Sequence, residues 1–207
     1  MAAGQLRVGV LASGSGTNLQ AILDHVHGFE ARVVAVASDK PDAYALERAR
    51  ASEVPASVFP RDAFPDRAIR DAAIGDWLEA QGVELVVLAG YMAILSEAFI
   101  ARFRDKIINI HPSLLPAFAG LAAVEQAIDY GVKVFGVTVH FVDEGVDTGA
   151  IILQRAIDLP SATDAPAVLT SLRPLEHALL PEAVRLIAAG RVHRDPSHPR
   201  RVVIDES

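Results

Sequence analysis

Short apolar runs alternate with segments of helical periodicity along the first half of the chain. Residues 6–12, LRVGVLA, form a β-branched apolar run, and the next apolar residues recur at the spacing of one helix face, at Leu19, Ile22, Leu23 and Val26. The same reasoning predicts strands at 31–37, 55–59 and 83–88, and helices at 42–50, with Pro41 in the first turn, and at 69–81. Runs that are almost continuously apolar are typical of strands buried on both faces, which favours a parallel sheet covered by helices.

The second half continues this pattern and then changes. A helix is predicted at 99–103, a strand at 107–110 and a helix at 122–130. Strands at 134–142 and 151–159 are joined by an acidic, glycine-rich loop, which indicates an antiparallel pair. In a closing helical region, 165–189, Pro174 and Pro181 are expected to kink or divide the helix.

The predicted fold class is therefore α/β. We expect a Rossmann-like, mostly parallel sheet with helices on both faces and an antiparallel extension in the C-terminal half. Residues 1–207 contain no repeat and no linker-like segment, which favours a single domain.

Composition and charge narrow the class of protein. The chain has 207 residues, of which 51% are hydrophobic, no cysteine and a formal net charge of −7. This apolar content suits a packed core, whereas the longest apolar stretch, 85–95, is shorter than the roughly 20 residues that cross a bilayer. A net negative charge argues against nucleic-acid binding, and the lack of cysteine excludes disulfides and thiolate chemistry. We expect neither a membrane nor a nucleic-acid partner.

The two ends of the chain carry little functional signal. The first ten residues lack the basic and long apolar regions of a signal peptide, so a cytoplasmic location is expected. Basic residues crowd the C-terminus, at Arg191, His193, Arg194, His198, Arg200 and Arg201. We interpret 191–207 as a solvated basic tail rather than a binding patch.

The segment SGSGTN at 13–18 lies between the first predicted strand and helix. Free N–H groups at a helix N-terminus favour an anion, and glycine lets the backbone approach it closely. The spacing matches neither the dinucleotide nor the Walker pattern, so a monophosphate fits better. A tight turn with Thr17 as a helix cap is the structural alternative.

Asn109 and His111 end another predicted strand and are followed by a proline-bounded loop. Residues two apart in a strand point to the same face, and ligands of open α/β sheets bind at the carboxyl ends of strands. An amide beside an imidazole suits acyl transfer, since the amide can stabilise an oxyanion and the histidine can manage protons.

The loop DEGVDTG at 143–149 follows a strand that contains His140. Its carboxylates can orient and charge a histidine, or they can bind a metal. A zinc site of His111, His140 and Asp147 is conceivable, but no compact ligand pair supports it, so we expect no metal. His140 is interpreted as a packed strand histidine with a supporting role.

Five segments carry a resemblance to a known family: SGSGTNLQAI, DKPDAYALERA, VVLAGYMAIL, INIHPSLLP and TVHFVDEGVDTG. In this order and spacing they resemble the phosphoribosylglycinamide formyltransferases, which belong to the folate-dependent formyltransferases. The resemblance runs from about residue 7 to 189. It implies transfer of a formyl group from the co-substrate 10-formyltetrahydrofolate to the amine of glycinamide ribonucleotide, a step of purine biosynthesis.

The resemblance also implies roles for single residues. The catalytic residues would be Asn109, His111 and Asp147, and the ribonucleotide would be bound by Gly16, Thr17, Asn18 and Glu176. The folate would be bound by Arg67, Tyr91, Met92, Leu95, Val142, Asp143 and Glu144. Residues 6–95 would form the phosphate- and ribonucleotide-binding half and 96–190 the catalytic and folate-binding half. The partners would be small molecules, with the chain a monomer or a homodimer.

Five positions depart from the family pattern: Ala93, Ala119, Ala122, Ala150 and Pro174. None removes a catalytic residue, so we expect them to alter affinity for substrate or folate. Two alternatives use the same chemistry: a formyltetrahydrofolate deformylase, with water as acceptor, and a formyltransferase with another amine acceptor. A non-catalytic nucleotide-binding module, in which Asn109 and His111 are structural, is a third interpretation.

Overall fold

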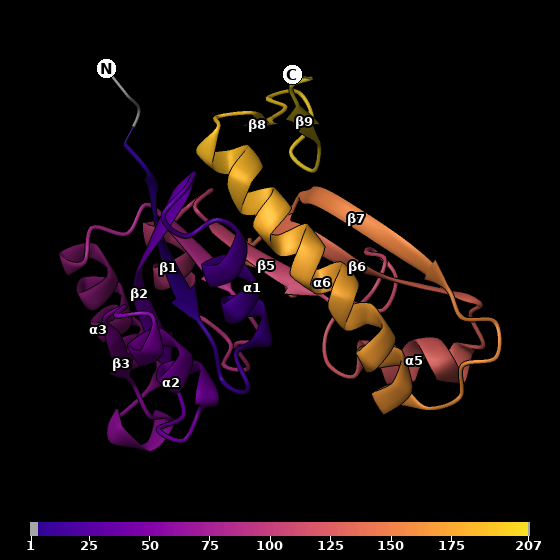
Figure 1. Ribbon diagram of the computed structural model, residues 1–207, viewed down its shortest axis with the longest axis horizontal. Helices are drawn as coiled ribbons and strands as arrows, with labels where there is room; N and C mark the ends of the chain where they lie inside the picture. Colours follow the sequence, from indigo (N-terminus) through magenta and orange to yellow (C-terminus); the bar gives the residue numbers. More distant parts are fainter. Residues whose placement is uncertain (1–3, 207) are drawn as a thin grey trace. The chain divides into compact units, whose positions relative to one another are not determined.

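The computed structural model describes residues 4–206 and contains one seven-stranded sheet, in the order β3-β2-β1-β4-β5-β6-β7, and a separate pair, β8-β9 (Figure 1). The pairs β1–β2, β1–β4 and β2–β3 are parallel, and β6–β7 is antiparallel. The predicted mostly parallel sheet with an antiparallel extension is confirmed. The chain divides into two compact units, the first ending at Ile108 and the second beginning at Asn109.

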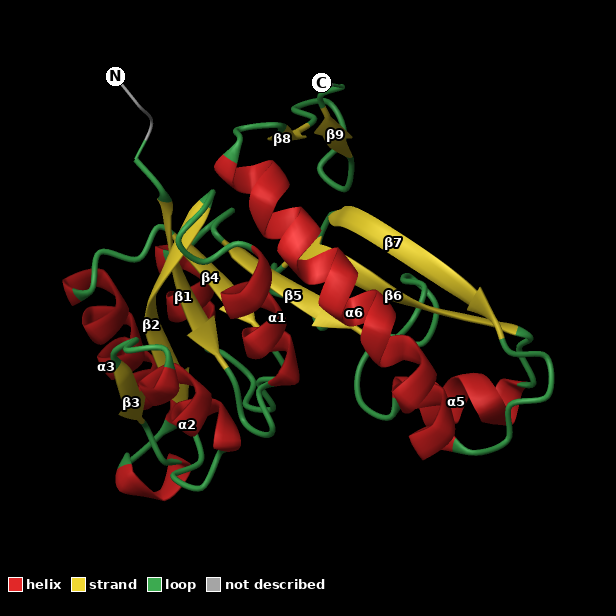
Figure 2. Cartoon of the chain, viewed as in Figure 1, coloured by secondary structure: helices red, strands yellow, loops and turns green. Residues whose placement is uncertain are grey.

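The first unit contains four strands and the helices between them (Figure 2). Its strands are β1 (Leu6–Leu11), β2 (Ala31–Ser38), β3 (Ala56–Val58) and β4 (Leu85–Leu88), and its helices are α1 (Thr17–His25), α2 (Tyr44–Ala51), η1 (Arg61–Ala63), α3 (Arg67–Ala80) and α4 (Glu97–Arg102). All four residues of β4 are buried, as are seven of the eight in β2. Because neighbouring strand residues point to opposite faces, both faces of these strands are covered, as their apolar sequence predicts.

Local chemistry sets the helix boundaries in this unit. Asp66 begins α3, since its side chain accepts a hydrogen bond from Ile69 N. Gly82, with φ of 69°, follows the C-terminal end of α3, as predicted. The helix expected from residue 42 begins only at Tyr44, with Ala43 extended before it, so Pro41 lies outside the helix and that prediction is wrong.

The second unit is built on the antiparallel pair. β5 (Ile107–His111) leads into it, and α5 (Ala123–Tyr130), β6 (Val134–Phe141), β7 (Ile151–Asp158) and α6 (Ala165–Ala188) follow. α6 packs against β6 and β7. Pro174 and Pro181 do not divide it, because it continues as one 24-residue helix (Figure 1). Its buried apolar residues, among them Leu172 and Leu180, stabilise the helix despite the two missing N–H donors.

The C-terminal segment, expected as a solvated basic tail, is mostly exposed but contains a pair of strands that was not predicted. β8 (Val192–Arg194) and β9 (Val202–Ile204) form an antiparallel pair. Its basic residues are used internally: Arg191 donates to the carbonyl of Asp205, and His193 Nε2 lies 2.8 Å from the Asp205 carboxylate. The guanidinium of Arg194 lies 5.6 Å from the ring centre of Phe141, at the end of β6. Hydrogen bonds and a cation–π contact therefore help to hold this short pair of strands.

No helix among residues 4–206 is both long and apolar enough to cross a membrane.

Candidate active site

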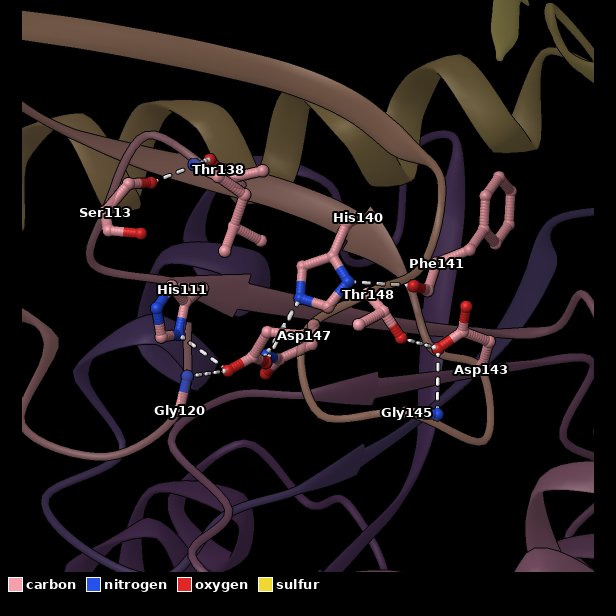
Figure 3. A network of polar contacts seen from close by, with 12 residues as sticks. His111, Ser113, Gly120, Thr138, His140, Phe141, Asp143, Gly145, Asp147 and Thr148 are labelled. Carbon is pink, nitrogen blue, oxygen red and sulfur yellow. Dashed lines mark hydrogen bonds and ion pairs between the residues drawn. The ribbon is translucent and has the colours of Figure 1, made fainter. Parts of the chain in front are cut away.

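Asn109, His111 and Asp147 meet in the second unit. Figure 3 shows His111 facing Asp147. Asn109 and His111 lie two residues apart on β5, and Asp147 comes from the loop between β6 and β7. One carboxylate oxygen of Asp147 lies 3.3 Å from Nδ1 of His111, and the other accepts a hydrogen bond from Asn109 Nδ2 at 3.3 Å. Three residues far apart in sequence thus form one polar cluster.

His140 completes this cluster and was given only a supporting role by its sequence context. The side chain is 1% exposed, and its Nδ1 lies 2.8 Å from the carbonyl of Phe141. That contact requires a proton on Nδ1, so Nε2 accepts from Asn109 Nδ2, 3.2 Å away. Nε2 also lies 3.5 Å from Asp147. His140 therefore fixes the orientation of the Asn109 amide.

His111 turns both ring nitrogens toward oxygen acceptors. Nε2 lies 2.9 Å from the carbonyl of Phe118, and Nδ1 faces the Asp147 carboxylate. A neutral imidazole has only one N–H, whereas the imidazolium has two, so the protonated form satisfies both acceptors. The side chain is 5% exposed, which strengthens this pairing with the carboxylate.

The electrostatics of Asp147 balance opposing effects. Burial by itself raises the pKa of this carboxyl. The contact with His140, donation from Gly120 N at 2.9 Å and the charge of His111 together outweigh burial and hold the Asp147 pKa below its ordinary value. Asp147 is therefore ionised at neutral pH.

The acidic loop is shaped by its own residues. Asp143 accepts hydrogen bonds from Thr148 Oγ1 at 2.6 Å and from Gly145 N at 3.1 Å, which closes the turn (Figure 3). A Cβ at Gly149 would lie 1.7 Å from the carbonyl oxygen of Phe141, so only glycine fits there. Asp147 itself has φ of 53°, a conformation that aspartate tolerates better than most residues. Asp143, expected in the folate pocket, thus also organises the loop.

The proline-bounded loop after His111 is anchored to β6 and β7. Thr138 Oγ1 donates to the carbonyl of Ser113 at 2.7 Å and accepts from Leu115 N at 3.1 Å. Gln154, opposite Thr138 in the antiparallel register, donates to the carbonyl of Leu115 at 2.9 Å. These bonds fix the loop that carries Phe118, the partner of His111. No sequence signal pointed to Thr138 or Gln154, because both lie in ordinary strand patterns.

The turn SGSGTN lies in the first unit, at the N-terminus of α1. Gly16 is the N-cap, and no side chain among residues 4–206 caps this end, so the alternative with Thr17 as the cap is wrong. The uncapped N–H groups suit an anion. Gly16 is also required by packing, since its φ is 68° and a Cβ would lie 2.7 Å from Ala45 Cα. Arg48, which sequence analysis did not single out, donates to the carbonyl of Ser15 at 2.8 Å.

The remaining predicted residues lie in three places. In the first unit, Tyr91, Met92 and Leu95 follow β4, and Arg67 is the exposed first residue of α3. Met92 is 59% exposed and free to contact a ligand, whereas Leu95 is 7% exposed and packs in the core.

Tyr91 has a buried hydroxyl with no hydrogen-bond partner among residues 4–206. Burial is the main cause that raises its pKa to about 12. The phenol is therefore neutral at physiological pH.

In the second unit, Val142 and Glu144 follow β6, and Glu176 lies on α6. Glu176 is half-buried. The unbroken helix through Pro174 keeps Glu176 in regular helical geometry.

Metal binding has little support in this geometry. Among the residues that the structure describes, no group of three or more histidines, aspartates or glutamates could hold a metal ion. His111 and His140 each turn one nitrogen to a backbone carbonyl and the other to Asp147 or Asn109. Their nitrogens are already engaged in hydrogen bonds.

The chain is similar to a known family model and to named proteins over most of its length. The formyl transferase family model matches residues 6–184. The phosphoribosylglycinamide formyltransferase of Haemophilus influenzae is 44% identical over 188 residues, covering 90% of this chain and 89% of that protein. The crystal structure of glycinamide ribonucleotide transformylase 1 from Symbiobacterium toebii has a TM-score of 0.93 at 48% identity, covering 98% of this chain and 95% of that one. The enzyme named phosphoribosylglycinamide formyltransferase from Bacillus subtilis is 40% identical, covering 85% of this chain and 91% of the relative. The chain belongs to the formyl transferase family.

Proposed function

We propose that this protein transfers the formyl group of 10-formyltetrahydrofolate to the primary amine of glycinamide ribonucleotide. The observation that carries the proposal is the cluster of Asn109, His111 and Asp147, held at hydrogen-bond distances in a chain of this family. An amide, an imidazolium and a carboxylate are the groups that a tetrahedral acyl-transfer intermediate requires.

The reaction proceeds by direct attack. The amine nitrogen of the ribonucleotide forms a bond to the formyl carbon, and the formyl oxygen becomes an oxyanion. The bond from carbon to the folate nitrogen N10 then breaks, and the proton lost by the amine passes to N10. The products are the formylated ribonucleotide and tetrahydrofolate, so no covalent enzyme intermediate is needed.

Asn109 and His111 stabilise the oxyanion in this scheme. Both N–H groups of Asn109 are engaged by His140 and Asp147, at 3.2 and 3.3 Å. These bonds are longer than the usual distance of roughly 2.9–3.0 Å, so the amide can turn one N–H to the developing charge at a small cost in free energy. Asp147 orients the His111 ring through its contact with Nδ1 and can hold the water that carries the proton from the amine to N10.

The phosphate of the ribonucleotide is assigned to the turn of Gly16, Thr17 and Asn18. The support is the uncapped N-terminus of α1 at Gly16. An anchored phosphate makes the attack of the amine a positioned one, which favours the amine over water. Glycinamide ribonucleoside, which lacks the phosphate, should therefore bind far more weakly, and equal affinity would refute this assignment.

The remaining assignments complete the proposal. Glu176 binds the ribonucleotide, and the folate is contacted by Arg67, Tyr91, Met92, Leu95, Val142, Asp143 and Glu144. The partners are these small molecules, not nucleic acid or membrane, in keeping with the net charge of −7. A monomer or homodimer in the cytoplasm suits a chain without cysteine.

One assay separates the proposal from its alternatives. Formyl loss from 10-formyltetrahydrofolate should be slow alone and rise greatly with glycinamide ribonucleotide, with the formyl group recovered on the ribonucleotide. His111→Ala and Asn109→Ala should each reduce kcat about 10²- to 10³-fold. Rapid release of formate at a rate that the ribonucleotide does not alter would support a deformylase. Formyl transfer to another amine, but not to glycinamide ribonucleotide, would support a formyltransferase with a different acceptor. A wild-type protein without turnover would favour a binding module.

A further inference from the structure

The segment between β4 and α4 carries Tyr91, Met92 and Leu95, which the proposed function assigns to the folate, and the inference below rests on that function. Residues 91–96 form no helix or strand. Their backbone is held by side chains from other elements of the first unit. Accurate placement of this segment therefore depends on residues that need not touch the folate.

Ser13, directly before the turn at 14–18, holds the start of this segment with two hydrogen bonds. Ser13 N donates to the carbonyl of Gly90 at 3.0 Å, and Ser13 Oγ accepts from Met92 N at 2.8 Å. The side chain is 4% exposed, so water does not compete freely for these groups. One residue thus engages the backbone at positions 90 and 92.

Asp39 sets the direction of the hydroxyl. Ser13 Oγ donates its single proton to Asp39 Oδ1 at 2.5 Å, which leaves its lone pairs for Met92 N. The other oxygen of Asp39 accepts from Arg61 Nε at 2.9 Å. The Asp39 side chain is 1% exposed, and a carboxylate cannot donate, so the order of donors and acceptors is fixed.

A buried ion pair holds the far end of the segment. Asp71 Oδ2 accepts from Ser96 N at 2.6 Å, and Asp71 Oδ1 accepts from Arg70 at 2.7 Å. Arg70 also donates to the carbonyl of Ile94 at 3.4 Å. The two side chains are 5% and 0% exposed. The segment is therefore held at residue 96 independently of Ser13.

We propose that Ser13 is a positioning residue for the folate: oriented by Asp39, it fixes the Met92 amide and with it the exposed Met92 side chain. Ser13, Asp39 and Met92 each follow the carboxyl end of a strand, where ligands of such sheets bind. A residue that only stabilised the fold would lower the apparent kcat through the amount of folded protein and leave the KM values unchanged, whereas Ser13 acts on folate binding.

Ser13→Ala tests this proposal against Ser38→Ala as a matched control. Ser38 is also a buried serine, 1% exposed, and its Oγ accepts from the backbone N of Lys40 at 3.0 Å. Both variants thus remove one hydroxyl and one bond to a backbone amide. Ser13→Ala should raise the KM for 10-formyltetrahydrofolate about tenfold, with kcat and the KM for the ribonucleotide within about twofold, while Ser38→Ala should leave all three within about twofold.

Amide hydrogen exchange measured by NMR gives a readout that does not depend on activity. In Ser13→Ala the Met92 amide should exchange at least about tenfold faster, while the Ser96 amide, held by Asp71, should not change. An unaltered folate KM or unaltered Met92 exchange would overturn the positioning role while the proposed function stands. A wild-type protein that neither binds nor turns over the folate would overturn both.

Discussion

The carboxylate of Asp147 lies 3.3 Å from Nδ1 of His111, and its Oδ2 also accepts from Gly120 N at 2.9 Å. This arrangement leaves the carboxylate 15% exposed and surrounded by donors. Its ionised form is therefore favoured, which is the physical cause of its lowered pKa.

Asp147→Asn should reduce kcat about 100-fold, because the amide no longer supplies the charge that favours the imidazolium of His111. It should also change stability at acid pH. A carboxyl group whose pKa is lowered on folding stabilises the protein above its unfolded pKa, near 4, and this contribution is lost as the pH falls through the folded value. When the free energy of unfolding is measured by denaturation between pH 2 and 7, it should decrease less at acid pH for Asp147→Asn than for the wild type.

One result of the pH series would contradict the role assigned to Asp147. If the wild type and Asp147→Asn lose stability in parallel below pH 4, Asp147 does not gain its ionisation from this cluster. Asp158→Asn is a suitable control, since Asp158 lies at the end of β7 that is distant from the loop carrying Asp147.

His140→Gln tests the orientation of the Asn109 amide. His140 Nε2 lies 3.2 Å from Asn109 Nδ2, and a flexible glutamine places its acceptor less exactly. We expect kcat to fall about tenfold with the KM values of both substrates little changed. His193→Gln, at an exposed histidine paired with Asp205, is the control and should leave kcat unchanged. A KM effect without a kcat effect would assign His140 to substrate binding instead.

The sequence predicted much of the fold because buried parallel strands leave a direct signature. Residues 33–37 and 85–88 are continuously apolar since both their faces are covered. The hairpin of β8 and β9 escaped prediction for the opposite reason: its strands are only three residues long, lie in a segment crowded with basic residues and are held by polar contacts. α6 was expected to kink or divide at Pro174 because proline disrupts a helix locally. That prediction did not include the tertiary packing of the apolar face of the helix.

The candidate site was predictable only in part. The i, i+2 spacing places Asn109 and His111 on one face of β5 without further information. Asp147 lies 36 residues beyond His111, and only the family resemblance linked the two. His140 was undervalued because a histidine in an alternating strand is usually a packing residue, and its contact with Asn109 depends on the pairing of strands.

Chelation should leave activity unchanged. The nitrogens of His111 and His140 are committed to hydrogen bonds, and no triad of metal ligands occurs among residues 4–206. Turnover after dialysis against EDTA should therefore equal that of untreated protein. Loss of activity that added Zn²⁺ or Mg²⁺ restores would contradict the metal-free mechanism.

Ala93→Arg and Ala122→His restore the residues that the family pattern has at these two positions, and the two variants should have different effects. Ala122 is exposed with φ of 55°, and histidine tolerates this region better than most residues, so Ala122→His should fold normally. Ala93 is 8% exposed, so Ala93→Arg must bring a charge into the core and should lower stability by about 1–3 kcal/mol. Calorimetry should detect tighter binding of the folate or the ribonucleotide by Ala122→His. Unaltered affinity would mean that the pocket compensates for Ala122 elsewhere.

Gly16 and Gly14 should differ sharply in tolerance to substitution, although both belong to the segment SGSGTN. A Cβ at Gly16 would lie 2.7 Å from Ala45 Cα, and its φ of 68° is itself costly for alanine. Gly16→Ala should therefore lower the free energy of unfolding by about 2–4 kcal/mol, through overpacking and backbone strain. At Gly14 a Cβ would meet nothing within 4 Å, so Gly14→Ala should change stability by less than about 1 kcal/mol. Urea denaturation of the two variants measures the difference. Equal stabilities would contradict the close packing of this turn on α2, and they would leave approach to the phosphate as the reason for glycine at position 16.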